Sequence, residues 1–141
     1  MSLVLDSSAT LGWFYPDETT VLLNELFDRV AIRGAFVPEL WKIEVANSLS
    51  RGIRRRRITI SERDEALADL DALSITVDRH AGKYVWKETL SLADRHSLTV
   101  YDATYLELAL RLTLPLATLD DDLRNAAERE GVELLGKYVA A

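Results

Sequence analysis

The chain has 141 residues, 48% of them hydrophobic, so residues 1–141 are expected to form a single domain with one sizeable core. It contains no cysteine, which excludes disulfides, zinc–thiolate sites and cysteine nucleophiles. The formal net charge of −6 disfavours general affinity for nucleic acid but permits a local basic patch.

The elements predicted along the chain alternate between strands and helices. The run at residues 3–5 is short and wholly apolar, which is typical of a strand buried on both faces of a parallel sheet. Later segments show either helical spacing of apolar residues or further short apolar runs. In chain order we expect a strand at 3–5, helices at 9–14 and 18–32, a strand at 35–37, helices at 41–55 and 61–73, a strand at 75–77, helices at 81–95 and 102–112, a strand at 115–119, a helix at 121–130 and a closing strand at 132–135.

Local signals set the boundaries of these elements. Gly34 is expected to end the second helix, and Ser61, with Asp64 three residues later, is expected to cap the fourth. Strands that alternate with helices pair in parallel and are covered by helices on both faces. The predicted fold is therefore an α/β three-layer α/β/α sandwich around a mainly parallel central sheet of four to five strands.

Targeting and membrane segments are not expected. The N-terminus lacks the basic segment and the long apolar run of a secretory signal peptide. No later segment is apolar over a length that spans a bilayer. We therefore expect a cytoplasmic protein without membrane association.

Acidic residues follow two of the predicted strands. Asp6 ends the first strand and Asp120 the fourth, and ligands of open parallel sheets bind beyond the carboxyl ends of the strands. Glu44 lies on a helix whose neighbours three and four residues away are apolar on one side and polar on the other, so we expect it to be half buried. Asp102 begins a helix in line with mostly apolar residues and is expected to face the core.

Each acid also has a plain structural explanation. Asp6, Asp102 and Asp120 stand at predicted helix starts, where a carboxylate caps free backbone N–H groups. Thr99 and Asp102 fit the spacing of a capping pair. For Glu44 the alternative is a buried ion pair with a nearby arginine, because an unpaired buried carboxylate is costly.

Considered together, the acids indicate metal chemistry. Carboxylates that meet at one sheet edge repel each other and retain protons unless a cation neutralises them. Oxygen ligands without Cys or His favour hard ions, namely Mg²⁺ or Mn²⁺. Such an ion lowers the pKa of a water molecule that can then attack a phosphodiester. The pattern predicts a metal-dependent nuclease whose catalytic and metal-binding residues are Asp6, Glu44, Asp102 and Asp120.

Four stretches of the sequence resemble a known family. They are residues 3–9 (LVLDSSA), 38–49 (PELWKIEVANSL), 99–109 (TVYDATYLELA) and 116–120 (LATLD). In order and spacing they resemble the PIN-domain family, and specifically the VapC-type toxins of bacterial and archaeal toxin–antitoxin pairs. The resemblance implies a homodimeric endoribonuclease that needs Mg²⁺ or Mn²⁺, cleaves RNA and is silenced by a cognate antitoxin.

Individual residue roles follow from the resemblance, position by position. The acids become the metal site, Ser8 and Thr118 become hydroxyls that orient them, and Asn47 becomes a supporting polar group nearby. Asp121 remains an alternative to Asp120 as the fourth acid, since the two are adjacent. Asp120 is favoured because Thr118 and Asp120 reproduce the threonine-x-aspartate spacing of the family.

A cluster of arginines lies near the end of the helix predicted at 41–55. Arginine side chains pair well with phosphates, so the cluster is a candidate RNA-binding surface. The alternative is a solvated helix end, where cations are favoured by the helix dipole. The cluster comprises Arg51, Arg54, Arg55, Arg56 and Arg57.

Other functions fit parts of the pattern. A DNase of the same fold, or a PIN-like module that binds without cutting, would use the same scaffold. Phosphoryl transfer through an aspartyl-phosphate on Asp6 is disfavoured, because Ser8 stands where such phosphatases have a second aspartate. Asp6, Ser8 and Thr10 also resemble the metal-dependent adhesion motif of von Willebrand A-like binding modules, but those modules have no use for Glu44.

Overall fold

The computed structural model describes residues 1–137, and within them each predicted strand has a counterpart. In chain order the elements are β1 (Val4–Leu5), α1 (Ser7–Gly12), α2 (Val21–Arg33), β2 (Ala35–Pro38), α3 (Leu40–Arg54), α4 (Ile60–Asp71), β3 (Ile75–Asp78), η1 (Ala81–Lys83), η2 (Val85–Thr89), α5 (Leu90–His96), α6 (Val100–Leu112), β4 (Leu116–Ala117), α7 (Asp121–Arg129) and β5 (Leu134–Leu135). The alternation of strands and helices expected from the sequence is confirmed.

The central sheet is parallel throughout, with the strand order β3-β2-β1-β4-β5. The chain moves outward from β1 through β2 to β3 and then returns to the other side of β1 as β4. Open parallel sheets bind ligands where the strand order reverses in this way. The register pairs Leu5 with Ala117, so the residues that follow these two strands, Asp6 and Thr118, leave the sheet side by side.

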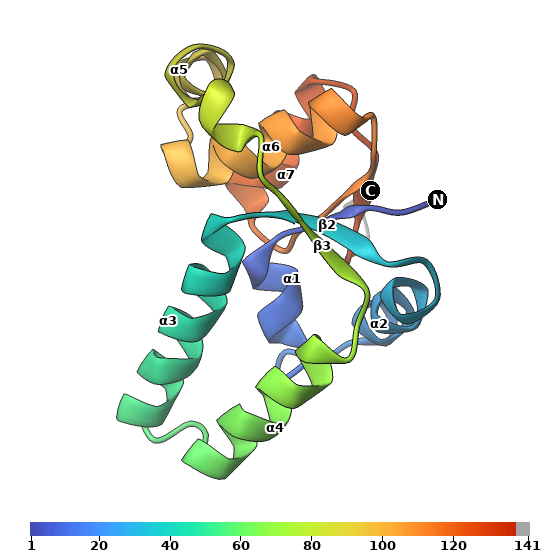
Figure 1. Cartoon of the computed structure of the whole chain (residues 1–141), viewed down its shortest axis with the longest axis vertical. Coiled ribbons are helices and arrows are strands. Elements are labelled where there is room, and N and C mark those ends of the chain that lie inside the picture. Colours follow the sequence, from blue (N-terminus) through green and yellow to red (C-terminus); the bar gives the residue numbers. More distant parts are fainter. Residues whose placement is uncertain (138–141) are drawn as a thin grey trace.

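Helices cover both faces of the sheet, with α1 to α4 on one side and α5 to α7 on the other (Figure 1). Helix α6 packs on β1, β2 and β4, and its residues 103–109 are all buried. On the opposite side, α3 and α4 project beyond the sheet (Figure 1). In the part of the chain described, no helix has both the length and the apolar character needed to cross a membrane. The predicted three-layer α/β/α sandwich is confirmed.

A buried tryptophan fixes α3 relative to β1. The indole Nε1 of Trp41 donates a hydrogen bond to Oγ1 of Thr10 at 3.0 Å, and this hydroxyl donates to the backbone oxygen of Asp6 at 3.0 Å. The contacts tie α3 to α1 and to the end of β1. Glu44 lies three residues after Trp41, on the same side of the helix, and is thereby brought to the sheet edge.

The cap of α4 differs from the prediction, which placed it at Ser61 with Asp64. The cap is Thr59, whose hydroxyl accepts a hydrogen bond from the Glu62 backbone N at 3.1 Å, while the Glu62 carboxylate accepts one from the Thr59 backbone N at 3.0 Å. A glutamate at this spacing reaches back to the cap residue and completes a capping box. Ser61 is instead exposed within the first turn.

The single helix predicted at 81–95 is wrong. The segment divides into a 3-10 turn (η1), a π-helical stretch (η2) and the short α5. Between η1 and η2, the ring of Tyr84 stacks on the Arg111 guanidinium, 4.6 Å from its centroid, and Arg111 is also paired with Asp78 at 2.8 Å. The segment therefore packs on α6 at the point where the expected helix is broken, and such a contact between elements leaves no trace in helical periodicity.

Candidate active site

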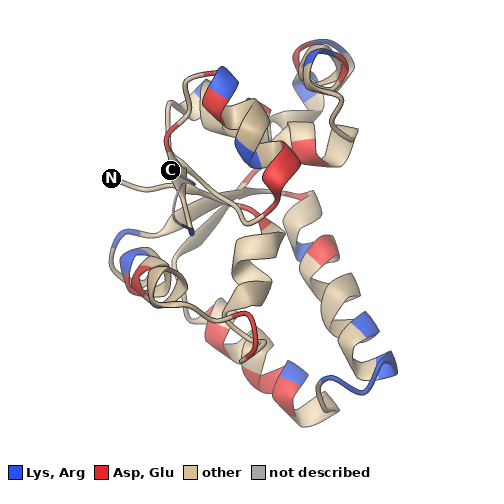
Figure 2. Cartoon of the chain, turned by 180° about the vertical axis from the view of Figure 1, so that it is seen from behind, with Lys and Arg blue, Asp and Glu red and all other residues tan. Residues whose placement is uncertain are grey.

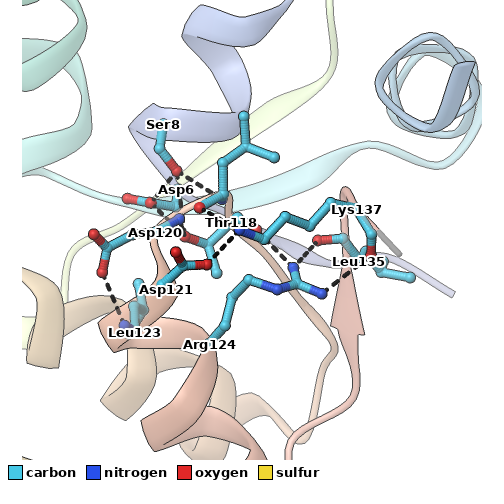
Figure 3. A network of polar contacts seen from close by, with 10 residues as sticks. Asp6, Ser8, Thr118, Asp120, Asp121, Leu123, Arg124, Leu135 and Lys137 are labelled. Atoms are coloured by element: carbon cyan, nitrogen blue, oxygen red, sulfur yellow. Dashed lines mark hydrogen bonds and ion pairs between the residues drawn. The ribbon is translucent and has the colours of Figure 1, made fainter. Parts of the chain in front are cut away.

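Asp6 lies at the centre of a hydrogen-bond network where β1 and β4 end (Figure 3). It is only 3% exposed, and its Oδ2 accepts hydrogen bonds from Ser8 Oγ at 2.6 Å and from Thr118 Oγ1 at 2.8 Å. Burial raises the pKa of Asp6, and the two hydroxyls partly oppose that rise. Although Asp6 precedes α1, its side chain forms no capping hydrogen bond, so capping does not explain it. Both residues predicted to be orienting hydroxyls contact this acid.

Glu44 is half buried on α3, as predicted from the pattern of its neighbours. Its Oε1 accepts hydrogen bonds from the Tyr105 hydroxyl and from Ser7 Oγ, the latter at 3.4 Å. Burial raises the pKa of Glu44, the Tyr105 hydrogen bond opposes this, and the charge of Asp6 adds to the rise. The partners of Glu44 among residues 1–137 are therefore hydroxyls, and not the arginine of the ion-pair alternative.

Asp102 lies in the first turn of α6, but it does not cap that helix. Thr99 is the cap, and its hydroxyl accepts a hydrogen bond from the Asp102 backbone N at 3.1 Å. Burial raises the pKa of the Asp102 carboxyl to about 6, and the charges of Asp120, Asp6 and Glu44 contribute to that rise. The acids separated along the sequence therefore face one another closely enough to interact electrostatically.

The structure separates Asp120 from its neighbour Asp121. Asp120 Oδ2 accepts a backbone hydrogen bond at 2.8 Å from the first turn of α7, so this acid is also a helix cap. Its charge raises the pKa of both Asp6 and Asp102. Asp121 is exposed and is paired with Lys137. Of the two adjacent acids, Asp120 is the one that lies among the other carboxylates.

The four carboxylates gather without forming a complete coordination shell. Within residues 1–137, no three acidic or histidine side chains lie close enough together to hold a metal ion as they stand. In three of these acids, however, the hydrogen bonds that the carboxylate accepts fall on a single oxygen. These oxygens are Oδ2 of Asp6, Oε1 of Glu44 and Oδ2 of Asp120. Burial is the main cause of the raised pKa values of Asp6, Glu44 and Asp102, and the charge of a neighbouring acid adds to each rise, so a cation at this site would favour the ionised carboxylates. The chemistry of these donors fits a hard divalent cation.

Three residues differ from the predicted site: Asn47 was expected beside the acids, whereas Ser7 and Tyr105 were not predicted. Asn47 is exposed on α3, and its side chain forms no hydrogen bond within the described part of the chain. Ser7 and Tyr105, in contrast, both bind Glu44. The available signal for Tyr105 was its position three residues after Asp102, which puts both on one side of α6. Ser7 carried no comparable signal.

A cleft of about 310 Å³ opens beside the acids. Its wall also includes part of the segment that joins α1 to α2. Positive charge gathers at the tip of α3 and in the turn that follows it (Figure 2). The predicted residues that line the cleft are Ser8 and Asp120 at the acidic end, and Arg51, Arg55 and Arg57 at the other. Of the four candidate acids, Asp120 lines the cleft, together with three of the five predicted arginines, and Arg54 and Arg56 do not line it.

Comparison with known proteins identifies the family. The family model described as PIN domain matches residues 3–129. The chain belongs to the PIN domain family. This PIN domain is 31% identical to Ribonuclease VapC3 of Pyrobaculum aerophilum, over 87% of this chain and 92% of that protein. It is 35% identical to Ribonuclease VapC1 of Mycobacterium tuberculosis, over 63% of this chain and 65% of that protein.

Two solved structures share the fold of this PIN domain. PAE2754 from Pyrobaculum aerophilum superposes with a TM-score of 0.66 and 17% identity, over 95% of this chain and 89% of that one. FitAcB from Neisseria gonorrhoeae superposes with a TM-score of 0.65 and 15% identity, over 96% of both chains. At these identities the likeness establishes the fold alone. The family and the fold predicted from four short stretches of sequence are confirmed.

Proposed function

We propose that this chain, residues 1–141, acts as a single PIN-like nuclease domain that hydrolyses RNA phosphodiester bonds with the help of a divalent cation. The observation that carries the proposal is the set of buried and half-buried carboxylates at the switch point of the sheet, beside an arginine-lined cleft. The similarity to Ribonuclease VapC3 over nearly the whole chain supports the choice of RNA as the substrate.

The catalytic and metal-binding residues in this proposal are Asp6, Glu44, Asp102 and Asp120. Their oxygen ligands suit Mg²⁺ or Mn²⁺. When bound, such a cation supplies positive charge that activates an attacking water and stabilises the leaving oxygen. The protein's contribution is orientation: the hydroxyls of Ser8 and Thr118 fix Asp6, and that of Tyr105 fixes Glu44.

The cleft offers a path for the RNA backbone away from the acids. Arg51 and Arg55 are exposed along it, and guanidinium groups can bind phosphates through two hydrogen bonds at once. Arg57 pairs with Asp17 at 3.2 Å and stacks 4.1 Å from the ring centroid of Tyr15, so it also shapes the wall. The net charge of −6 does not oppose RNA binding here, because the local field depends on these arginines and on a cation at the acids.

The resemblance to VapC ribonucleases extends the proposal to partners. In it, the protein is the toxin of a toxin–antitoxin pair, works in the cytoplasm as a homodimer, and is silenced by a cognate antitoxin protein. Light scattering of the purified chain tests the dimer. Co-purification with the product of a short neighbouring reading frame, followed by loss of nuclease activity in the complex, tests the antitoxin.

Cleavage assays test the enzymatic function. The purified chain is incubated with tRNA and rRNA fragments, and with DNA of the same sequences, in EDTA, Mg²⁺ or Mn²⁺. We expect RNA cleavage that EDTA stops and Mn²⁺ restores. Asp6→Asn should retain the wild-type circular dichroism spectrum but lose roughly a thousandfold or more in rate, because the cation loses a central ligand.

The other outcomes of this assay separate the alternatives. Faster cleavage of DNA than of RNA supports the DNase, and binding of the fragments without cutting supports a PIN-like binding module. Cutting that continues in EDTA, or in Asp6→Asn, contradicts the proposed chemistry.

A further inference from the structure

The loop that joins β4 to α7, residues 118–120, supplies several donors to the acidic site. Thr118 Oγ1 donates to Asp6 Oδ2 at 2.8 Å, and the Leu119 backbone N donates to Ser8 Oγ at 2.9 Å. The Asp120 backbone N donates to Thr118 Oγ1 at 3.1 Å. We call residues 118–120 the site loop. The Thr118 hydroxyl thus donates to a carboxylate, and the Leu119 and Asp120 N–H groups donate to the two hydroxyls that contact Asp6.

Two cations bind the carbonyl oxygens of the same loop (Figure 3). Nη1 of the buried Arg124 donates to the Thr118 backbone O at 2.7 Å and to the Leu135 backbone O at 3.0 Å. Nη2 of Arg124 donates to the Lys137 backbone O at 3.1 Å, and Nζ of Lys137 donates to the Leu119 backbone O at 3.1 Å. We call Arg124 and Lys137 the cation clasp.

The clasp acts on the donors through the geometry of the peptide bond. Each peptide unit is planar, so the direction of a carbonyl fixes the direction of the N–H of the next residue. Holding the Thr118 carbonyl therefore orients the Leu119 N–H toward Ser8, and holding the Leu119 carbonyl orients the Asp120 N–H. The clasp thus lies on one side of the site loop, and the groups it orients lie on the other.

Burying an arginine only to join one strand to its neighbour costs more free energy than a backbone hydrogen bond does. Arg124 is 6% exposed, and its hydrogen bonds are made to neutral carbonyls. Burial lowers the pKa of Arg124, which reflects the cost of removing this charge from water. The backbone hydrogen bond from Thr118 N to Leu135 O already joins β4 to β5. Joining β4 to β5 therefore does not require Arg124, and we look for its role in its contact with the site loop.

We propose that Arg124 and Lys137 are positioning residues of the nuclease site, which fix the site loop and through it Asp6 and Asp120. Neither side chain is hydrogen-bonded to a carboxylate that would bind the cation. Leu135 of β5 and Lys137 therefore support the active centre, although they contribute no carboxylate. The effect on cleavage rests on the proposed function, whereas the effect on the loop does not.

Amide hydrogen exchange measures the loop without requiring activity. In metal-free protein, we expect the Leu119 and Asp120 amides to exchange about tenfold or more faster in Arg124→Lys and in Lys137→Met than in the wild type, because their hydrogen bonds open more often. The β1 amide of Val4 should be unchanged. Arg129→Lys, an exposed position on the same helix, is the matched control and should exchange like the wild type.

Kinetics then separate positioning from a purely structural role. For Arg124→Lys we expect kcat to fall about tenfold while the KM for RNA stays within about twofold, and Mn²⁺ binding by calorimetry to weaken by a similar factor to kcat. Wild-type exchange at both loop amides, or a lower Tm with wild-type kcat, overturns the inference. If Arg124→Lys does not fold, the same readouts on Lys137→Met decide. If the wild type neither cuts nor binds Mn²⁺, the proposed function fails and the exchange data alone decide on the clasp.

Discussion

The two ends of the cleft are built on different principles. Next to the Asp120 end, side chains from α3, α6, the site loop and the residue after β1 are linked by hydroxyls, and Asp6 is almost completely buried. At the other end, Arg51 and Arg55 stand exposed on the last turn of α3 and just after it. Ligands of a cation must be held within a fraction of an ångström, whereas phosphate contacts tolerate adjustment. We infer that the first end performs chemistry and the second holds substrate.

The largest effect that separates the two ends is expected at Tyr105, beside the acids. Its buried hydroxyl donates to Glu44, and burial raises the pKa of Tyr105 far above its usual range, so the proton stays available for that bond. We expect Tyr105→Phe to keep the ring in the core but to lower kcat by roughly ten- to a hundredfold with little change in the KM for RNA. Tyr101→Phe, exposed on the same helix, is the control. Wild-type kcat in Tyr105→Phe would remove orientation of Glu44 from the account.

Substitutions at the arginine end should act on binding instead. We expect Arg51→Gln and Arg55→Gln each to raise the KM for RNA about threefold to tenfold with kcat nearly unchanged. Each should also reduce the slope of the logarithm of the RNA-binding constant against the logarithm of the salt concentration by about 0.7 per lost phosphate contact. Salt titrations of binding and kinetics measure both effects. Arg54→Gln lies off the cleft and serves as the control. An equal rise in KM for Arg54→Gln would mean that RNA does not follow this cleft.

The smallest expected effect concerns the stability of the metal-free protein. The pKa of Asp102 is about 6 in the folded chain against an ordinary value of 3.8, so the folded state holds this proton more tightly than the unfolded state. Its contribution is therefore most favourable below about pH 4 and is lost as the pH rises through about 6. In EDTA at pH 7.5, Asp102→Asn should be more stable than the wild type by on the order of 1 kcal/mol, allowing for partial exposure.

Urea unfolding at several pH values checks this prediction. The difference between Asp102→Asn and the wild type should shrink toward pH 4 and vanish below about pH 3, where the wild-type carboxyl is protonated in both states. Mn²⁺ should reverse the order at pH 7.5, because a bound cation stabilises the folded wild type. A less stable Asp102→Asn in EDTA at pH 7.5 would show that burial and the neighbouring acids do not raise the pKa of Asp102 as described.

The strand ends were the part of the site that the sequence could predict. Short apolar runs identify β1 and β4, and a parallel sheet brings their carboxyl ends to one edge, so Asp6 and Asp120 were placed correctly relative to each other. The half-buried position of Glu44 followed from the pattern on its own helix. In each case the necessary information lies within a few residues of the acid.

Contacts between side chains of different elements could not be predicted from the sequence. The bond from Tyr105 to Glu44 depends on the distance between α6 and α3, and no periodicity encodes that distance. The clasp depends on the Arg124 side chain reaching the Leu135 carbonyl of β5. The sequence pattern of α7 alone would suggest a charged side chain on the helix surface. The stacking of Tyr84 on Arg111, beside the break in the helix expected at 81–95, has the same origin. Where a side chain is satisfied by a distant partner, local pattern gives its position but not its role.

Mn²⁺ binding to the intact, metal-free chain, followed by calorimetry, tests most directly whether the clustered carboxylates form one cation site. We expect saturable binding that Asp6→Asn abolishes and that Asp121→Asn, a change at the exposed partner of Lys137, leaves intact. Absence of binding in the wild type, or binding that survives in Asp6→Asn, would contradict it.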